Sequence, residues 1–430
     1  MKKKVLVFPA GTEIGLELHN ALKYSTIFEV WGGTSSRDHS YYVYKNLIEG
    51  LPFVTDADFI EEMNRVCTQN EISFIYPAHD SVNLMLAQHT DRLCAAVITS
   101  PLPTVDICRD KAKTYAFFSG ADFIPRTFAN PHEVTSYPVF IKPTVGQGSV
   151  GAKKITSAVQ LKEALQESTE PMVICEYLSG MEYTIDCFTD KYGVLQCAKM
   201  RDRARIKTGI SVNSHIVPLP IQVQQIANTI NQKLTFKGAW FFQVKKNNEG
   251  AYKLLEISPR IPGTMGVSRN LNINFAQLSL YTAMDYDVSI NANDYDITVD
   301  RAFINRYDTK IKYDHVYVDL DDTLILNKDT VNSYLMMFLY QCVNQEKTVT
   351  LLTKHAKDVE NTLAAHKIGI CLFDEILHIA PGENKAHYIK HHKNAIFIDD
   401  SFSERRSVAE ELGLPVFDLD SIECLIDWRM

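Results

Sequence analysis

A loop with three glycines follows a predicted strand in the sequence FIKPTVGQGSVGAKKI, at residues 140–155. The strand ends at Lys142, and the loop contains Gly146, Gly148 and Gly151. Glycines let backbone N–H groups turn toward an anion, and a lysine adds a point charge for phosphate. The spacing does not match a Walker A loop. Taken alone, a loop with three glycines is more often a plain flexible turn than a phosphate site, so the segments that follow decide between the two.

A second segment with the residue types for chemistry is GAWFFQVKKNNEGAYKLLEISPRIPGT, at residues 238–264. It predicts two strands that bring Gln243 and Glu256 to a shared face. Because side chains alternate along a strand, Ser258 and Arg260 fall on the same side as Glu256. Oxygen donors of this kind suit Mg²⁺ together with substrate phosphates, and an arginine beside them can clamp a transferring phosphoryl group.

With these segments in this order, residues 1–290 resemble the ATP-grasp superfamily, closest in style to the large subunit of carbamoyl phosphate synthetase. The resemblance implies an α/β lobe followed by two lobes that close on ATP. It also implies a set of nucleotide contacts: Lys111 and Lys142 at the phosphates, a lid that includes Gly146, Gln147, Gly148 and Ser149, an adenine hinge of Glu176, Tyr177 and Leu178, and Glu182 at the ribose.

The same resemblance implies the reacting end of the site. Gln243, Glu256 and Ser258 match the metal ligands, and Arg260 matches an arginine at the reacting phosphate. Ser258 stands where the family usually has Asn, which makes a second metal ion more loosely held. The resemblance also implies that Arg205 and Lys207 lie near an acyl-phosphate pocket.

The reaction implied by the resemblance is ATP-dependent ligation of a small-molecule carboxylate to an amine or another nucleophile, through an acyl phosphate. The cofactors implied are ATP and Mg²⁺, with Mn²⁺ as an alternative. Two other readings stay open. One is a kinase-like enzyme that stops at phosphoryl transfer, and the other is a nucleotide-binding regulatory module with a residual C-terminal domain.

A separate acidic motif, HVYVDLDDT, lies at residues 315–323. A run of β-branched and aromatic residues ends at Asp319, and Asp321 follows two positions later. Such a strand end exposes carboxylates at the carboxyl edge of a parallel sheet. With TVTLLTKH ending a strand at Thr353, Lys385 in PGENKAHYI, and Asp399 and Asp400 in AIFIDDSFSE, residues 310–430 resemble the haloacid dehalogenase superfamily of phosphatases.

This second resemblance implies a role for each motif. Asp319 is the nucleophile that attacks phosphorus, and Asp321 is the acid and base. Thr353 and Lys385 hold the phosphoryl oxygens. Mg²⁺ lies between Asp319, the backbone carbonyl of Asp321, and Asp400. The partner of this site is a phosphorylated small molecule. Thr353 follows Asp319 by only 34 residues, which leaves room for a minimal cap.

The alternation of predicted elements gives an α/β and α+β multidomain protein. Four parts are expected: a parallel α/β lobe at 1–103, a two-lobed ATP-grasp domain at 104–290, a connection at 291–312, and a Rossmann-like phosphatase domain at 313–430. The turn at residues 9–15 lacks the GxGxxG spacing, so we interpret it as a tight strand-to-helix turn rather than a nucleotide site.

The 430 residues include 44 Lys and Arg against 52 Asp and Glu, for a net charge of −8. This balance argues against nucleic-acid partners, which require a basic face. No apolar run approaches the roughly 20 residues that span a bilayer, so no membrane partner is expected. The nine cysteines are scattered without a CxxC pair, which favours reduced thiols in a cytoplasmic protein. An oligomer is possible.

Overall fold

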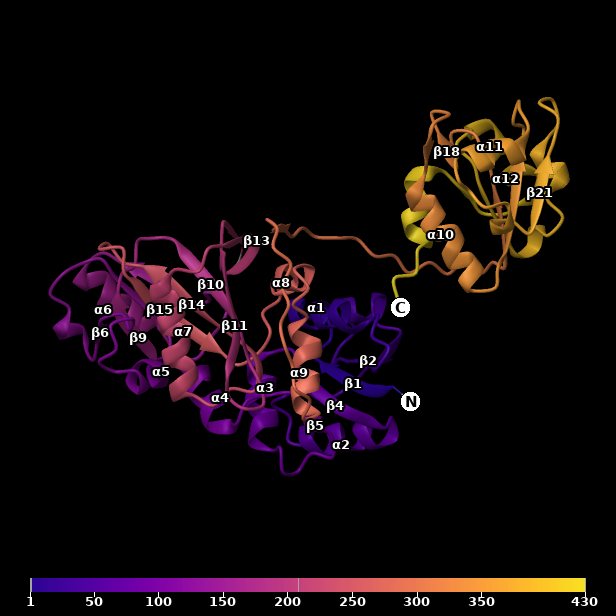
Figure 1. Ribbon diagram of the computed structural model, residues 1–430. Coiled ribbons are helices and arrows are strands. Elements are labelled where there is room, and N and C mark those ends of the chain that lie inside the picture. The colour runs from indigo at the N-terminus through magenta and orange to yellow at the C-terminus, as the bar shows by residue number, and fades with distance from the viewer. Residues whose placement is uncertain (1, 208, 430) are drawn as a thin grey trace. The chain divides into compact units, whose positions relative to one another are not determined.

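The computed structural model describes residues 2–207 and 209–429. The chain folds as two compact units, Met1–Phe303 and Ile304–Arg429 (Figure 1). Each unit has its own buried hydrophobic clusters. We therefore describe each unit by itself.

The first unit begins with a parallel sheet whose strand order is β3-β2-β1-β4-β5. Strand β1 forms because the run Val5, Leu6, Val7 and Phe8 is buried on both faces by helices, as a parallel strand requires. The order reverses at β1, so β1 and β4 flank the switch point of the sheet. The elements of this lobe are β1 (Lys3–Phe8), α1 (Glu13–Leu22), β2 (Phe28–Gly33), β3 (Asn46–Ile48), α2 (Phe59–Gln69), β4 (Ile72–Pro77), α3 (Asp80–Gln88) and β5 (Ala96–Val97).

A four-stranded antiparallel sheet follows, in the order β6-β9-β7-β8. Helix α6 packs on it through the buried side chains of Leu161 and Ala164. The elements here are α4 (Leu102–Arg109), α5 (Lys111–Phe117), β6 (Thr127–Phe128), β7 (Val139–Pro143), β8 (Lys153–Ile155), α6 (Ala158–Glu167) and β9 (Met172–Glu176).

The largest sheet of the unit has seven strands in the order β12-β13-β11-β10-β14-β15, with β16 paired to β13. Its core is centred on Trp240, which stacks on Phe236 with the ring centroids 4.0 Å apart. The elements are β10 (Glu182–Thr189), β11 (Leu195–Asp202), β12 (Arg205–Lys207), β13 (Ile210–Val217), α7 (Ile221–Lys233), β14 (Gly238–Lys246), β15 (Tyr252–Ser258), α8 (Gly266–Asn270), α9 (Phe275–Ala283) and β16 (Thr298–Asp300).

The second unit is a five-stranded parallel sheet in the order β21-β20-β17-β22-β23, which again reverses at its first strand. A small hairpin, β18 with β19, and helix α10 occupy the chain between β17 and β20. The elements are β17 (His315–Val318), β18 (Ile325–Leu326), β19 (Thr330–Val331), α10 (Ser333–Asn344), β20 (Thr348–Thr353), α11 (Val359–Ala365), β21 (Glu375–His378), β22 (Ala395–Ile398), α12 (Phe402–Leu412) and β23 (Val416–Phe417).

Short 3₁₀ helices complete both units. They are η1 (His39–Tyr42), η2 (Pro131–Glu133), η3 (Ile370–Leu372), η4 (Lys385–Tyr388), η5 (His392–Asn394) and η6 (Leu419–Leu425). Within the described residues, no helix has both the length and the apolar character that a bilayer span needs.

Mixed α/β architecture with parallel sheets agrees with the sequence-based expectation. The connection expected at 291–312 contains a strand, because Thr298–Asp300 forms β16 and pairs with Asn213–His215 of β13. The polar and aromatic residues of this segment show no strand pattern. The strand forms because the edge of β13 is available for backbone pairing.

The adjacent residues Phe117 and Phe118 provide a matched test of this packing. Phe118 is fully buried in the cluster around Trp240, whereas Phe117 is 41% exposed. We expect Phe118→Ala to lower the free energy of unfolding by about 3–5 kcal/mol, because it leaves a cavity. Phe117→Ala should cost about 1 kcal/mol or less. Urea unfolding followed by tryptophan fluorescence measures both, and equal losses would contradict the assigned packing.

Candidate functional site

An open pocket lies between the four-stranded and the seven-stranded sheets of the first unit. Its cavity volume is about 150 Å³. We call it the first pocket. Side chains from β7, β9, β14 and β15 line it, so both sheets contribute to one site.

Two lysines expected at the phosphates line the first pocket. Lys142, at the end of β7, is 8% exposed, and its Nζ donates to the Tyr115 hydroxyl at 2.7 Å and to the Leu255 carbonyl at 2.9 Å. Lys111 begins α5, and its Nζ donates to the Gly146 carbonyl at 3.1 Å. Burial lowers the pKa of both lysines, although nearby carboxylates oppose the effect. An anion that enters between them therefore meets partly desolvated positive charge.

Gln243 and Glu256 are directly opposite each other in the antiparallel pair β14 and β15. Both line the first pocket, as the sequence predicted for a shared face. The Glu256 carboxylate lies 3.7 Å from Lys111 Nζ, and its side chain is 32% exposed. A carboxylate and an amide oxygen at one position are hard oxygen donors, so this pair fits a Mg²⁺ ion that keeps waters and phosphate ligands.

The glycine loop at 146–151 closes one side of the first pocket. Gly209 packs so tightly on it that a Cβ atom at residue 209 would lie 2.2 Å from the Gly148 carbonyl carbon. Gly209 also has φ +74°, which only glycine adopts without strain. The side-chain amide of Gln147 contacts His79 Nε2 at 2.7 Å. The loop is therefore held to two other segments of the unit.

The expected adenine hinge and ribose residues also line the first pocket: Glu176, Tyr177, Leu178 and Glu182. Leu178 is buried, and the Glu176 carboxylate accepts from the Arg126 backbone N–H at 2.8 Å. Glu182 forms an ion pair with Arg203, with Nε and Oε1 3.0 Å apart. Arg203 was not among the predicted residues.

A second pocket adjoins the first and shares Lys111, Gln243 and Glu256 with it. We call it the arginine pocket after five lining residues: Arg109, Arg201, Arg203, Arg260 and Arg301.

Asp80 organises one wall of the arginine pocket. It accepts from Arg260 Nε at 2.8 Å and from the Ser258 hydroxyl at 2.9 Å. Burial alone would raise the pKa of Asp80, but the Arg260 charge and hydrogen bonds, with help from Arg109, hold it well below its usual range. Ser258 and Arg260, predicted as a metal ligand and a phosphate clamp, are thus both engaged with a residue that the sequence analysis did not single out.

Arg205 and Lys207 lie elsewhere. Arg205 forms an exposed ion pair with Asp300, and the Lys207 ammonium lies 4.7 Å from the ring centre of Phe303. Neither residue lines either pocket within the described part of the chain. The chain leaves β11 at Asp202 and turns into the β12–β13 hairpin, so Arg201 and Arg203 reach the pockets in their place.

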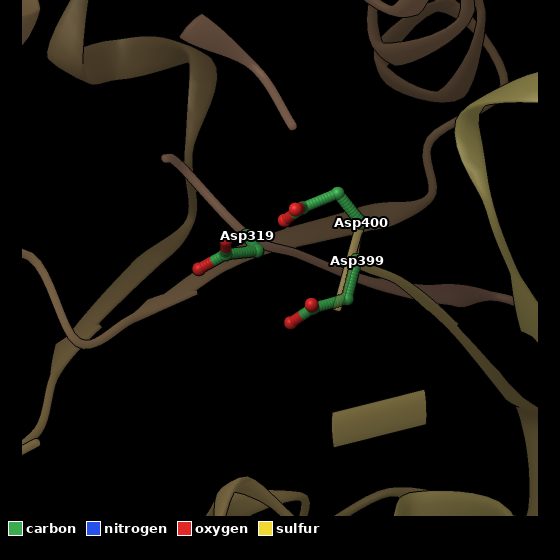
Figure 2. Close-up of side chains that lie close together, drawn as sticks. All are labelled: Asp319, Asp399 and Asp400. Carbon is green, nitrogen blue, oxygen red and sulfur yellow. The ribbon is translucent and has the colours of Figure 1, made fainter. Parts of the chain in front are cut away.

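In the second unit, carboxylates gather at the switch point between β17 and β22. Asp319 follows β17, Asp399 and Asp400 follow β22, and oxygen atoms of all three lie within 4.8 Å of one another. Figure 2 shows the three carboxylates extending to the same side of these strand ends. Such a set of hard oxygen donors fits Mg²⁺.

Lys385 bridges two members of this cluster. Its Nζ donates at 2.6 Å to Asp319 and at 2.6 Å to Asp399, and all three side chains are buried. Burial and the proximity of Asp319 raise the pKa of Asp399 to about 7, despite Lys385. Burial likewise raises the pKa of Asp319. The two carboxylates raise the pKa of Lys385 against the opposing effect of its burial.

The remaining predicted residues surround this centre. Thr353 ends β20, and its hydroxyl accepts from the His355 backbone N–H at 3.2 Å. His355 Nδ1 lies 2.9 Å from both oxygens of Asp321. Asp399 as a partner of Lys385, and His355 as a partner of Asp321, were not anticipated, because nothing in their spacing indicates those contacts.

A family model described as ATP-grasp in the biosynthetic pathway with Ter operon matches residues 168–302. The match lies wholly within the first unit and covers less than half of the chain. No curated protein matches the sequence.

Solved structures support the same fold for the first unit. N5-carboxyaminoimidazole synthetase from Staphylococcus aureus, complexed with ADP, has 14% identity and a TM-score of 0.57, covering 68% of this chain and 81% of that one. The biotin carboxylase domain of 2-oxoglutarate carboxylase from Hydrogenobacter thermophilus, with MgADP and bicarbonate, has 15% identity and a TM-score of 0.55, covering 68% and 71%. L-amino acid ligase from Bacillus licheniformis has 17% identity and a TM-score of 0.52, covering 66% and 74%. The first unit therefore has the ATP-grasp fold.

Removal of the Lys385 charge tests the buried cluster. Lys385→Met leaves Asp319 and Asp399 facing each other, so their pKa values rise further above those of the unfolded chain. Raised carboxyl pKa values make the folded state lose stability as pH increases. We expect the free energy of unfolding of Lys385→Met to be lower than that of the wild type by about 3–5 kcal/mol at pH 8, and by less at pH 5. Hydrogen–deuterium exchange of the backbone amides of β17 and β22 measures this loss of stability, with EDTA present to remove divalent cations.

The matched control is Lys390→Met. Lys390 and Glu375 form a surface ion pair at 3.4 Å, with side chains 66% and 44% exposed. This variant should change stability by about 1 kcal/mol or less at both pH values. A Lys385→Met deficit that is independent of pH would contradict the assigned charge cluster.

Proposed function

We propose that the first unit is an ATP-dependent carboxylate ligase that acts through an acyl phosphate. The observation that carries the proposal is the convergence of Lys111, Lys142, Gln243 and Glu256 on one pocket of an ATP-grasp fold. The ADP and MgADP complexes of the similar structures support ATP and Mg²⁺ as the cosubstrate and metal.

In this proposal the nucleotide occupies the first pocket. Backbone groups at 176–178 hold the adenine, and Glu182 holds the ribose. Lys111, Lys142 and backbone N–H groups of the loop at 146–151 hold the phosphates. Gln243 and Glu256 would hold Mg²⁺, which supplies neutralising charge at the phosphates when it is bound.

The substrate carboxylate lies in the adjoining arginine pocket. One of its oxygens attacks the γ-phosphorus, the bond from that phosphorus to the bridging oxygen breaks, and ADP leaves. An amine then attacks the acyl carbon, inorganic phosphate leaves, and the amine loses a proton. The contribution of the protein is to orient the reactants and to stabilise charge.

The adjoining pockets favour ligation over a site that only senses nucleotide, because a sensor needs no second pocket. A kinase-like transferase remains the alternative. The two are separated by ADP release with a carboxylate alone or with a carboxylate and an amine together. Ligation requires both substrates for turnover, whereas a kinase requires one.

Glu256→Gln tests the ligase proposal. Loss of the carboxylate that faces Lys111 should lower ADP formation at least about 100-fold, since one charged group at the reacting phosphate is removed. The assay is ADP release with a pool of carboxylates and amines, with product mass spectrometry. Glu249→Gln, an exposed position at the tip of the same β14–β15 hairpin, is the control and should retain activity. Retained activity in Glu256→Gln would refute the proposal.

We propose a second activity, phosphoester hydrolysis, for Ile304–Arg429. The cluster of Asp319, Asp399, Asp400 and Lys385 supports it. Asp319 attacks the phosphorus, and the ester oxygen leaves with a proton from Asp321. Water, deprotonated by Asp321, then attacks the phosphorylated Asp319 and releases phosphate. Asp319 and Asp400 would hold Mg²⁺, which supplies charge neutralisation when it is bound.

Asp319→Asn tests this activity. Without the nucleophile, hydrolysis of p-nitrophenyl phosphate in Mg²⁺ should fall at least about 1,000-fold. Asp329→Asn, an exposed aspartate of the adjacent hairpin, should leave the rate unchanged. Glu256→Gln should also leave it unchanged, while Asp319→Asn should leave ADP formation unchanged. Phosphate release that persists in Asp319→Asn, with the same KM, would exclude the assigned nucleophile.

We also propose a reducing compartment, the cytoplasm, for the protein. All nine cysteines are free thiols in the structure, and five of them are buried. Fractionation of cells that express the native protein, with thiol labelling, tests this location.

A further inference from the structure

Basic side chains outnumber acidic ones among the residues that line the arginine pocket, and two of them, Arg201 and Arg203, are paired with acids outside this lining, Asp186 and Glu182. The described lining residues of the pocket include six Arg or Lys side chains and three Asp or Glu side chains. Among the acids, Asp80 is bound to Arg260, and Glu256 lies at the end shared with the first pocket. Glu13 is the third and lies in the first turn of α1.

One wall of the arginine pocket lies at the switch point of the N-terminal sheet. Thr12, Glu13 and Ile14 follow β1, and Ala78 and His79 follow β4, which is its neighbour. This position is where open parallel sheets bind ligands. Helix α1 is ten residues long and begins here, so its first N–H groups add partial positive charge. The turn at 9–15, which we interpreted as a tight turn, thus forms part of a pocket wall.

Arg201 supplies an independent indication of a ligand. It is 1% exposed, and its Nε donates to the buried Asp186 at 2.9 Å. Its Nη2 donates to the same carboxylate at 3.3 Å, which leaves Nη1 buried with no hydrogen-bond partner among the described residues. A buried donor without a partner is costly, so a residue that lines a pocket in this state is suited to an anionic ligand.

Arg301 repeats the pattern from another element. It follows β16, lines the arginine pocket, and has a buried Nη1 without a hydrogen-bond partner in the part of the chain that the structure describes. It forms no ion pair with a carboxylate there, although Glu17 is close enough to feel its charge. Two guanidinium groups that line the same cavity therefore each have an Nη1 without a hydrogen-bond partner among the described residues.

We propose that the acid ligated by this protein carries a second oxyanion, a phosphate or a second carboxylate, bound by Arg201, Arg301 and the N-terminus of α1. Planar guanidinium groups and helix N-termini both suit such groups. The reacting carboxylate lies at the Lys111 end of the pocket. The cavity volume of about 280 Å³ leaves space for a small substrate with two separated anionic groups. That the bound acid is then ligated rests on the proposed ligase function, whereas the binding site for the second oxyanion does not.

Matched pairs of acids test the second oxyanion. We would measure binding by calorimetry in saturating MgADP, so that the first pocket is occupied. The probes are 3-phosphoglycerate against glycerate, and succinate against succinamate, its monoamide. We expect at least one doubly anionic probe to bind ten-fold or more tightly than its partner. A preference for 3-phosphoglycerate identifies phosphate, and one for succinate identifies carboxylate. A difference below three-fold in both pairs would overturn the proposal.

Two variants locate the effect. Arg301→Gln should reduce the preference ten-fold or more and should leave MgADP binding unchanged. Arg201→Lys keeps a positive charge beside Asp186 but has no Nη1. A folded Arg201→Lys protein should therefore also show a reduced preference for the doubly anionic probe. Arg92→Gln, which removes an exposed surface pair with Glu61, is the control. An unchanged preference in Arg301→Gln would overturn the proposal.

ADP formation in the same proteins separates this proposal from the ligase proposal. If singly charged acids drive ADP release as well as doubly anionic acids do, in both wild type and Arg301→Gln, the second oxyanion is wrong and the ligase stands. If a doubly anionic probe binds through Arg301 but no acid and amine pair releases ADP, the ligase is wrong and the binding site stands.

Discussion

The register between β14 and β15 is the constraint on which the first pocket depends. It sets Gln243 opposite Glu256, and the same strand presents the Leu255 carbonyl that accepts from Lys142. Tyr115 also donates to Leu255, so α5 and β7 are both tied to one peptide of β15. A slip of one residue would turn Glu256 away from the pocket and move the carbonyl that holds the lysine.

The two units solve the problem of buried charge in different ways. In the arginine pocket, Asp80 is surrounded by donors, and its charge is favoured despite burial. In the second unit, two carboxylates share one lysine, so their negative charge exceeds the positive charge beside them. A site of the second kind suits one more cation, and Asp400 is the least buried carboxylate of the cluster.

Much of the fold could be predicted because local patterns determine it. Buried runs such as Val5–Phe8 identify parallel strands, and two consecutive strand patterns predicted a shared face for Gln243 and Glu256, which are cross-strand partners in the structure. The contact of Asp80 with Arg260 joins residues 180 positions apart, and no local pattern contains it. Arg201 and Arg203 were missed in favour of Arg205 and Lys207 for a related reason. Alternation holds only within a strand, and β11 ends at Asp202, after Arg201 and before Arg203, Arg205 and Lys207.

The contact of Gly209 with Gly148 brings two backbones together with no side chain between them. Because the two backbones are in direct contact, water cannot pass between them to the part of the pocket that the loop covers. Mixed anhydrides of phosphoric and carboxylic acids are destroyed by water, and an enzyme that makes one must keep it dry until the second reactant arrives. In the proposed ligase, this backbone contact would protect the acyl phosphate from water, so that each ATP consumed leads to a new bond and not to hydrolysis.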